Sequence, residues 1–172
     1  MPKYDQAMLN VETAVGPGWG DEQEWIDLAW RAVRAALGVS PFANLIDKQV
    51  DVEVAVKLSD DDEVQGLNAT YRGKDKPTNV LSFPMVQPDL LQSLENSDDG
   101  EALLGDIILA RETCAREAEE KGVTIAQHAT HLIAHGTLHL LDYDHQNEAD
   151  AARMEELEVK ALATLGLANP YS

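Results

Sequence analysis

The spacing of hydrophobic positions changes from one segment of the chain to the next. Residues 50–58 alternate between aliphatic and mostly polar side chains, and this period of two predicts a strand with one wet face. Residues 103–110 are almost continuously apolar, which predicts a central strand covered on both faces. Asp106 interrupts that strand, and a buried carboxylate there would need a partner. A further strand is predicted over residues 78–83.

A helical period of about 3.6 residues marks most of the remaining chain. It predicts a helix from Asp21 to a stop at Gly38, and a short helix whose positive end is capped by the acidic run of residues 59–63. Three more helices are predicted, at residues 111–121, 124–141 and 148–165. Residues 86–101 are polar and without periodicity, so we expect an exposed loop there.

The order of these elements predicts the fold class. It favours an α+β fold, a single domain in which a small mixed β-sheet is packed with helices. The length of 172 residues suits one domain. We place this domain at residues 21–172, after a weakly ordered lead-in at residues 1–20 that ends in a glycine-rich loop.

Charge restricts the partners of this domain. The chain has 31 acidic and 13 basic residues, a net charge of −18, and should repel nucleic acid and anionic membranes at long range. This excludes a protein that coats nucleic acid by charge alone, but not a nuclease that meets RNA through one local patch. The lone Cys114 cannot form an internal disulfide, and we find no signal peptide or membrane helix, so we expect a cytoplasmic protein.

All five histidines of the chain lie close together in its last third. At about 100° per residue, His128, His131, His135 and His139 share a helix stripe about 80° wide, so the helix carries a histidine face. His135 and His139 are one turn apart and His145 follows six residues later, the spacing of the three histidines in the metzincin pattern. Three histidines leave a catalytic zinc its fourth position for water, so we predict that these three bind a metal ion.

The residue after the first ligand separates two kinds of chemistry. Metzincins carry a glutamate there as the general base for peptide hydrolysis. This chain has Gly136 instead, which disfavours a zinc metallopeptidase. His128 and His131 exceed what a three-ligand site needs, and roles behind the ligands, toward the substrate or as plain polar residues stay open for them.

Residues 135–145, HGTLHLLDYDH, resemble the signature H-G-x-L-H-L-x-G-Y-D-H of the YbeY family. Residues 71–84 and 104–107 resemble two further blocks of that family in the same order, so the resemblance covers about residues 21–165. Asp142 stands where the family usually has glycine, and it bears on the local turn more than on the ligand set. Members of the family are metal-dependent bacterial endoribonucleases of ribosomal RNA maturation and ribosome quality control.

The resemblance implies that His135, His139 and His145 bind one divalent metal ion, for which imidazole ligands favour Zn²⁺. It also implies that Arg72 is a functional residue of the active-site cleft. The implied substrate is RNA, a ribosomal RNA precursor, and the implied partners are the ribosome, ribosomal proteins or an assembly GTPase. No DNA or membrane partner is expected. The planar guanidinium of Arg72 suits phosphate, although a surface arginine paired with carboxylates is the alternative.

Weaker candidates surround these residues. Lys74 and Lys76 form with Arg72 a patch for the RNA backbone, or else a solvated turn. Asp144 orients a histidine or the metal-bound water, or only helps the chain to turn. The leading hypothesis is an endoribonuclease that uses metal-activated water or a metal-polarised phosphodiester. The alternatives are a ribosome-assembly factor with a mainly structural metal and, less favoured, the metallopeptidase.

Overall fold

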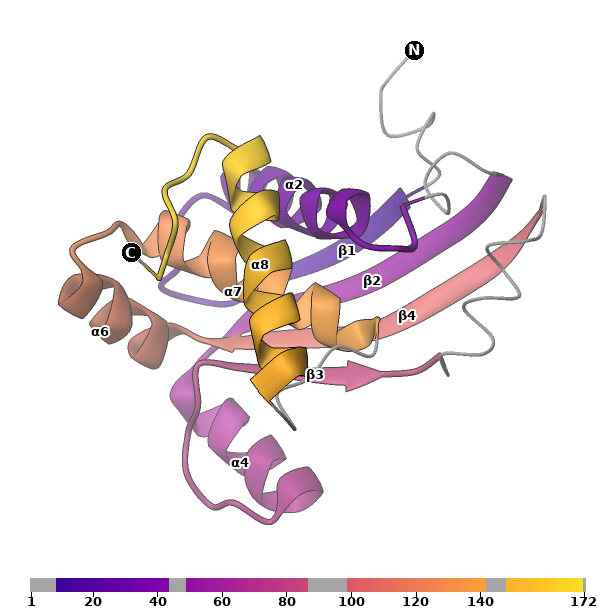
Figure 1. Cartoon of the computed structure of the whole chain (residues 1–172). Helices are drawn as coiled ribbons and strands as arrows, with labels where there is room; N and C mark the ends of the chain where they lie inside the picture. Colours follow the sequence, from indigo (N-terminus) through magenta and orange to yellow (C-terminus); the bar gives the residue numbers. More distant parts are fainter. Residues whose placement is uncertain (1–8, 44–48, 87–98, 142–147, 172) are drawn as a thin grey trace.

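The computed structural model describes residues 9–43, 49–86, 99–141 and 148–171 (Figure 1). In this part of the chain, five helices surround one four-stranded mixed sheet, which confirms the predicted α+β class. The strands are β1 (Leu9–Val15), β2 (Gln49–Ser59), β3 (Val80–Pro84) and β4 (Asp99–Ala110). The helices are α2 (Glu22–Val39), α4 (Asp61–Arg72), α6 (Arg111–Lys121), α7 (Ile125–Leu140) and α8 (Glu148–Thr164).

The sheet has the strand order β1-β2-β4-β3. β1, β2 and β4 run parallel, and β3 is an antiparallel edge strand beside β4. The predicted helices and strands are found close to their expected positions. The main difference is β4, which begins at Asp99, inside the segment for which we expected an exposed loop. The rest of that predicted loop, residues 87–98, lies outside the described residues.

Strand β1 corrects, for residues 9–15, the prediction of a weakly ordered lead-in at residues 1–20, of which residues 1–8 lie outside the described part of the chain. Residues 9–15 pair in parallel with β2, from Leu9 beside Val52 to Val15 beside Leu58. Burial along β1 alternates, with Leu9 buried and Asn10 exposed, as expected for a strand with one wet face. The same alternation is present in the sequence LNVETAV, but it covers only seven residues and a glycine-rich run follows it.

A β-bulge in β4 corrects two expectations. The pairing of β4 with β2 is shifted between Glu53 and Val54, so that Leu104 is an extra residue before Gly105. Gly105 has a φ of 145° and lies so close to the carbonyl of Phe83 that a Cβ would not fit. The shift places Asp106 on the face of the sheet that points away from the main hydrophobic core, where its side chain is half-buried. The strand is therefore not covered on both faces along its whole length.

The helices lie on both sides of the sheet. α2 and α7 pack on one face and enclose the main hydrophobic core, and α8 packs against both of them (Figure 1). On the other face, Val64 of α4 packs with Leu81 of β3 and Ala110 of β4. α7 therefore lies between the sheet and α8. No helix in the described part of the chain is long and apolar enough to cross a membrane.

Candidate metal centre

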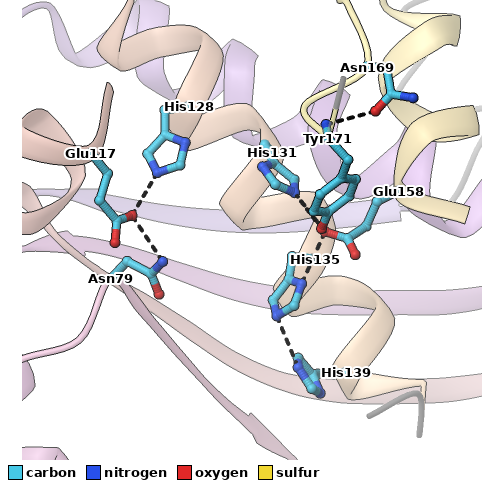
Figure 2. A network of polar contacts seen from close by, with 9 residues as sticks. All are labelled: Asn79, Glu117, His128, His131, His135, His139, Glu158, Asn169 and Tyr171. Carbon is cyan, nitrogen blue, oxygen red and sulfur yellow. Dashed lines mark hydrogen bonds and ion pairs between the residues drawn. The ribbon is translucent and has the colours of Figure 1, made fainter. Parts of the chain in front are cut away.

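Helix α7 carries four histidines in succession along one side (Figure 2). It begins at a capping box, in which Thr124 Oγ1 accepts from the backbone N–H of Gln127 and the Gln127 side chain accepts from the backbone N–H of Thr124. The rings of neighbouring histidines contact edge to face, with centroids 6.1, 6.4 and 4.6 Å apart from the first pair to the last. The sequence thus brings all the described histidines to one face of one helix.

The last two histidines of α7 are arranged as a pair. Nε2 of His135 lies 3.0 Å from Nε2 of His139, and both residues are half-buried. Two nitrogens that share a tetrahedral zinc lie about 3.3 Å apart, given Zn–N bonds of about 2.0–2.1 Å. The pair therefore has the spacing and donor atoms that suit a zinc ion. The third predicted ligand, His145, lies outside the described residues, as does Asp144, and within the described residues no group of three ligands is formed.

Glu158 of α8 contacts His135 at Nδ1, the ring nitrogen that does not face His139 (Figure 2). Its Oε1 atom lies 3.1 Å from Nδ1 of His135 and 2.7 Å from Nε2 of His131, and the residue is 0% exposed. A carboxylate can only accept, so both histidine nitrogens donate. Burial alone would raise the pKa of Glu158, but the hydrogen bonds from His131 and His135 outweigh it and lower the pKa to about 2. Glu158 is therefore ionised at neutral pH.

Tyr171 completes this group from the C-terminal segment. Its hydroxyl donates to Oε1 of Glu158 at 3.0 Å, and its ring contacts His131 edge to face with centroids 5.6 Å apart. Burial, followed by the negative charge of Glu158, raises the pKa of the Tyr171 hydroxyl. The phenol therefore stays protonated and remains a donor to Glu158.

His128 belongs to a separate contact on the same helix. Its Nε2 atom donates to Oε1 of Glu117 at 2.8 Å, and Nδ2 of Asn79 donates to the same oxygen at 3.0 Å. Burial lowers the pKa of His128, against the raising effect of Glu117. The contact joins α7 to α6 and to the residue before β3. Of the two histidines whose roles were left open, His128 thus cross-links elements, whereas His131 contacts the glutamate that holds His135.

The three candidate phosphate-binding residues, Arg72, Lys74 and Lys76, lie at the C-terminal end of α4 and in the turn that follows it. Arg72 ends α4, is exposed, and donates from Nη2 to the carbonyl of Ser82 on β3 at 3.3 Å. Lys74 and Lys76 are also exposed, after Gly73, which ends the helix in a left-handed conformation. In the described part of the chain Arg72 forms no ion pair with a carboxylate. Because α7 also packs on β3, Arg72 and the histidine pair belong to elements that share one strand.

The sequence analysis missed Glu158 and Tyr171. Glu158 had a readable signal, because it occupies a position in the apolar stripe of α8 together with Met154, Leu157, Ala161 and Leu162. A glutamate at a core position needs a buried partner, and the histidine face of α7 supplies two. Tyr171 had no such signal, because its contact depends on the path of the chain after α8.

Sequence comparisons with known proteins agree on one family. A family model described as Endoribonuclease YbeY matches residues 21–166. Curated proteins of the same description are similar over 165 residues and 96% of this chain: one from Sphingopyxis alaskensis is 64% identical, with 98% of its own length covered, and one from Rhizorhabdus wittichii is 59% identical, also with 98% covered. The solution structure of a Thermotoga maritima protein is similar in fold, with a TM-score of 0.53, 22% identity and 91% of each chain covered.

Proposed function

The chain belongs to the YbeY family, and from this membership we propose that it is a metal-dependent endoribonuclease of ribosomal RNA maturation. The observation that carries the metal dependence is the pairing of His135 and His139, whose Nε2 atoms lie 3.0 Å apart on consecutive turns of α7. His135, His139 and His145 would hold the ion, with zinc favoured by their imidazole nitrogens. When bound, zinc supplies a Lewis acid and lowers the pKa of a bound water to about 7.

The residues of the chain itself prepare this site for the ion. Because Nδ1 of His135 donates to Glu158, the lone pair of a neutral His135 is left on Nε2, the atom that faces His139. The half-burial of both rings limits, without preventing, the access of water. This arrangement suits a site that must both bind a metal ion and admit a substrate.

The exposed end of α4 supplies the positive charge that RNA cleavage needs. The guanidinium of Arg72 is held at β3 through one nitrogen, which leaves its other donors for a phosphate. Lys74 and Lys76 extend this charge along the turn. Next to Arg72, Tyr71 is 68% exposed and contacts Phe83 edge to face, so its ring offers a surface on which an RNA base can stack. In a chain with a net charge of −18, this surface fits local rather than general RNA binding.

Membership of the family also supports a wider role. We propose that the protein takes part in ribosome quality control in the cytoplasm, and that its partners are the ribosome, ribosomal proteins or an assembly GTPase. The strong negative charge supports a dependence on such partners, since the chain alone would be repelled by most RNA. Bare RNA should accordingly bind weakly and with a strong dependence on salt.

The decisive experiment compares RNA cleavage by His135→Ala, His139→Ala and wild-type protein loaded with zinc. We expect both variants to cleave RNA at least about 100-fold more slowly than the wild type, because each removes a ligand of the ion that supplies the chemistry. The matched control is His128→Gln, which changes a histidine of the same helix that contacts Glu117 instead. Cleavage by His135→Ala at the wild-type rate would overturn the proposal.

A further inference from the structure

We propose that Glu158 and Tyr171 are positioning residues for His135, so that the last helix and the C-terminal segment hold the candidate metal centre in shape. The inference rests on the proposed function only in taking His135 to be a metal ligand. It adds a dependence of metal affinity on two residues that lie outside the histidine motif, one on α8 and one beyond its end.

The geometry converges on a single oxygen (Figure 2). Oε1 of Glu158 accepts from Nε2 of His131 at 2.7 Å, from Nδ1 of His135 at 3.1 Å and from the hydroxyl of Tyr171 at 3.0 Å. Since the side chain is fully buried, these bonds are not exchanged with water. Three donors from two other segments thus fix the position of one carboxylate oxygen, and through it the ring of His135.

This oxygen also fixes which nitrogen of His135 is able to bind a metal. A neutral imidazole carries one proton, and the bond to Glu158 keeps that proton on Nδ1. Nε2 then carries the lone pair, on the side of the ring that faces His139. A carboxylate behind a ligating histidine also raises the basicity of the ligand and sets the orientation of its ring, and removing such a partner weakens metal affinity about 10- to 100-fold.

A purely structural role does not account for a glutamate at position 158. Its second oxygen, Oε2, and Nδ1 of His131 are both buried and have no hydrogen-bond partner within the described part of the chain. Such atoms cost stability, and an apolar residue would fill the same position in the stripe of α8 without that cost. Buried polar groups that are only partly satisfied are typical of functional sites. Glu117 and His128 show how the same fold makes a histidine–carboxylate link that only joins helices.

Tyr171 reaches this group because the chain turns back after α8. The backbone N–H of Tyr171 donates to Oδ1 of Asn169 at 2.7 Å, which stabilises the turn that delivers the ring (Figure 2). Although the residue is 47% exposed, its hydroxyl reaches the buried Oε1 of Glu158. The ring also lies edge-on to His131. The C-terminal segment therefore packs against His131 and Glu158, and the hydroxyl of Tyr171 is directed toward the buried carboxylate.

The test measures zinc affinity by competition with a chromophoric chelator, and needs no RNA. We expect Glu158→Gln to bind zinc about 10- to 100-fold more weakly than the wild type, because the shape is kept while the charge is lost. We expect Tyr171→Phe, which removes only the hydroxyl, to weaken binding severalfold. The matched control is Glu117→Gln, which alters the neighbouring carboxylate–histidine link and should leave zinc affinity within about twofold of the wild type. Wild-type affinity in Glu158→Gln, or an equal loss in Glu117→Gln, would overturn the inference.

A second measurement separates this inference from the proposed function. In metal-free protein, ¹⁵N NMR of the histidine side chains should show the proton of His135 on Nδ1, and Glu158→Ala should shift it toward Nε2. Wild-type protein that binds no zinc would refute the metal site, while the tautomer of His135 would still test the effect of Glu158. An unchanged tautomer in Glu158→Ala, together with a lower melting temperature, would show that the glutamate is structural and would overturn the inference.

Discussion

Gly136 of α7 lies directly against Ile107 of β4, so that a Cβ on the glycine would be 3.0 Å from Cγ2 of the isoleucine. Both residues are buried, and Ile107 belongs to the main core. The contact lets α7 approach the sheet closely at the residue that follows His135. A glutamate at this position, the residue that a metzincin uses as its base, would require Ile107 to shift. The metallopeptidase alternative is therefore disfavoured by packing as well as by sequence.

The first prediction is that Gly136→Ala destabilises the protein, although alanine is the better helix former. Replacing glycine by alanine in the interior of a helix favours the folded state by about 1 kcal/mol through helix propensity. Overpacking against a fixed core side chain costs about 1–3 kcal/mol. We expect a net loss of about 1 kcal/mol in the free energy of unfolding, measured by urea denaturation.

Gly66 provides the matched control for this prediction. It lies in the interior of α4 and is exposed, and a Cβ added to it would meet no atom within 4 Å. Gly66→Ala should therefore stabilise the protein by about 1 kcal/mol. If both alanine variants were stabilising, the close contact between Gly136 and Ile107 would be of no energetic consequence.

The second prediction concerns removal of the metal ion by a chelator. The main core is built mainly from apolar residues of α2, α7 and the sheet, and neither His135 nor His139 belongs to it. Removing a ligand present at 100 times its Kd costs about 2.7 kcal/mol, which for a domain of this size lowers Tm by about 5–11 °C. We expect the far-UV circular dichroism to be unchanged at 25 °C while RNA cleavage is lost. Unfolding at that temperature would instead favour the ribosome-assembly factor with a structural metal.

The third prediction concerns the lysines of the turn after α4. If Lys74 and Lys76 each neutralise one phosphate, each change to alanine should weaken RNA binding and reduce the slope of log K against log salt by about 0.7, the value for single strands. Fluorescence anisotropy with a labelled oligonucleotide, measured on His135→Ala to prevent cleavage, gives both quantities. Lys160→Ala is the control, because Lys160 lies on α8 and pairs with Glu156. An unchanged slope for the turn variants would identify a solvated turn.

The sequence predicted the elements whose pattern is local. Strict alternation over residues 50–58 was sufficient for β2, and the spacing of the histidines was sufficient to place four of them on one face of α7. Residues 9–15 also alternate, but β1 was not predicted, because a seven-residue alternation beside a glycine-rich loop is a weak local signal. Asp106 could not be placed, because the bulge before it changes which face it occupies.

The surroundings of the candidate site depend on contacts between distant segments. Glu158 meets His135 across 23 positions of sequence, and Tyr171 meets His131 across 40. No local pattern specifies which helix faces which, so the partner of a buried glutamate becomes known only when α7 and α8 are packed. The pairing of His135 and His139 was predictable, because residues four apart on a helix lie on consecutive turns of the same face.

The fourth prediction concerns Cys114, a fully buried thiol on α6. Burial, with a smaller contribution from the charge of Glu117, raises the pKa of this thiol from 9.0 to about 12. The native protein should therefore fail to react with a disulfide reagent at about pH 8, where the unfolded protein reacts at once. Rapid reaction of the native thiol would show that α6 opens readily.

The same shift of the Cys114 pKa predicts how stability depends on pH. Because the pKa is higher in the folded state, the contribution of the thiol is fully present below pH 9.0 and is lost as the pH rises toward about 12. Each pH unit in that window should cost up to about 1.4 kcal/mol. Between about pH 8.5 and 10.5 we expect the wild type to lose about 1–2 kcal/mol more than Cys114→Ala in urea unfolding. Other groups, such as Tyr171, titrate in both proteins and cancel in this difference, so equal losses would mean that the thiol ionises as freely in the folded protein as in the unfolded chain.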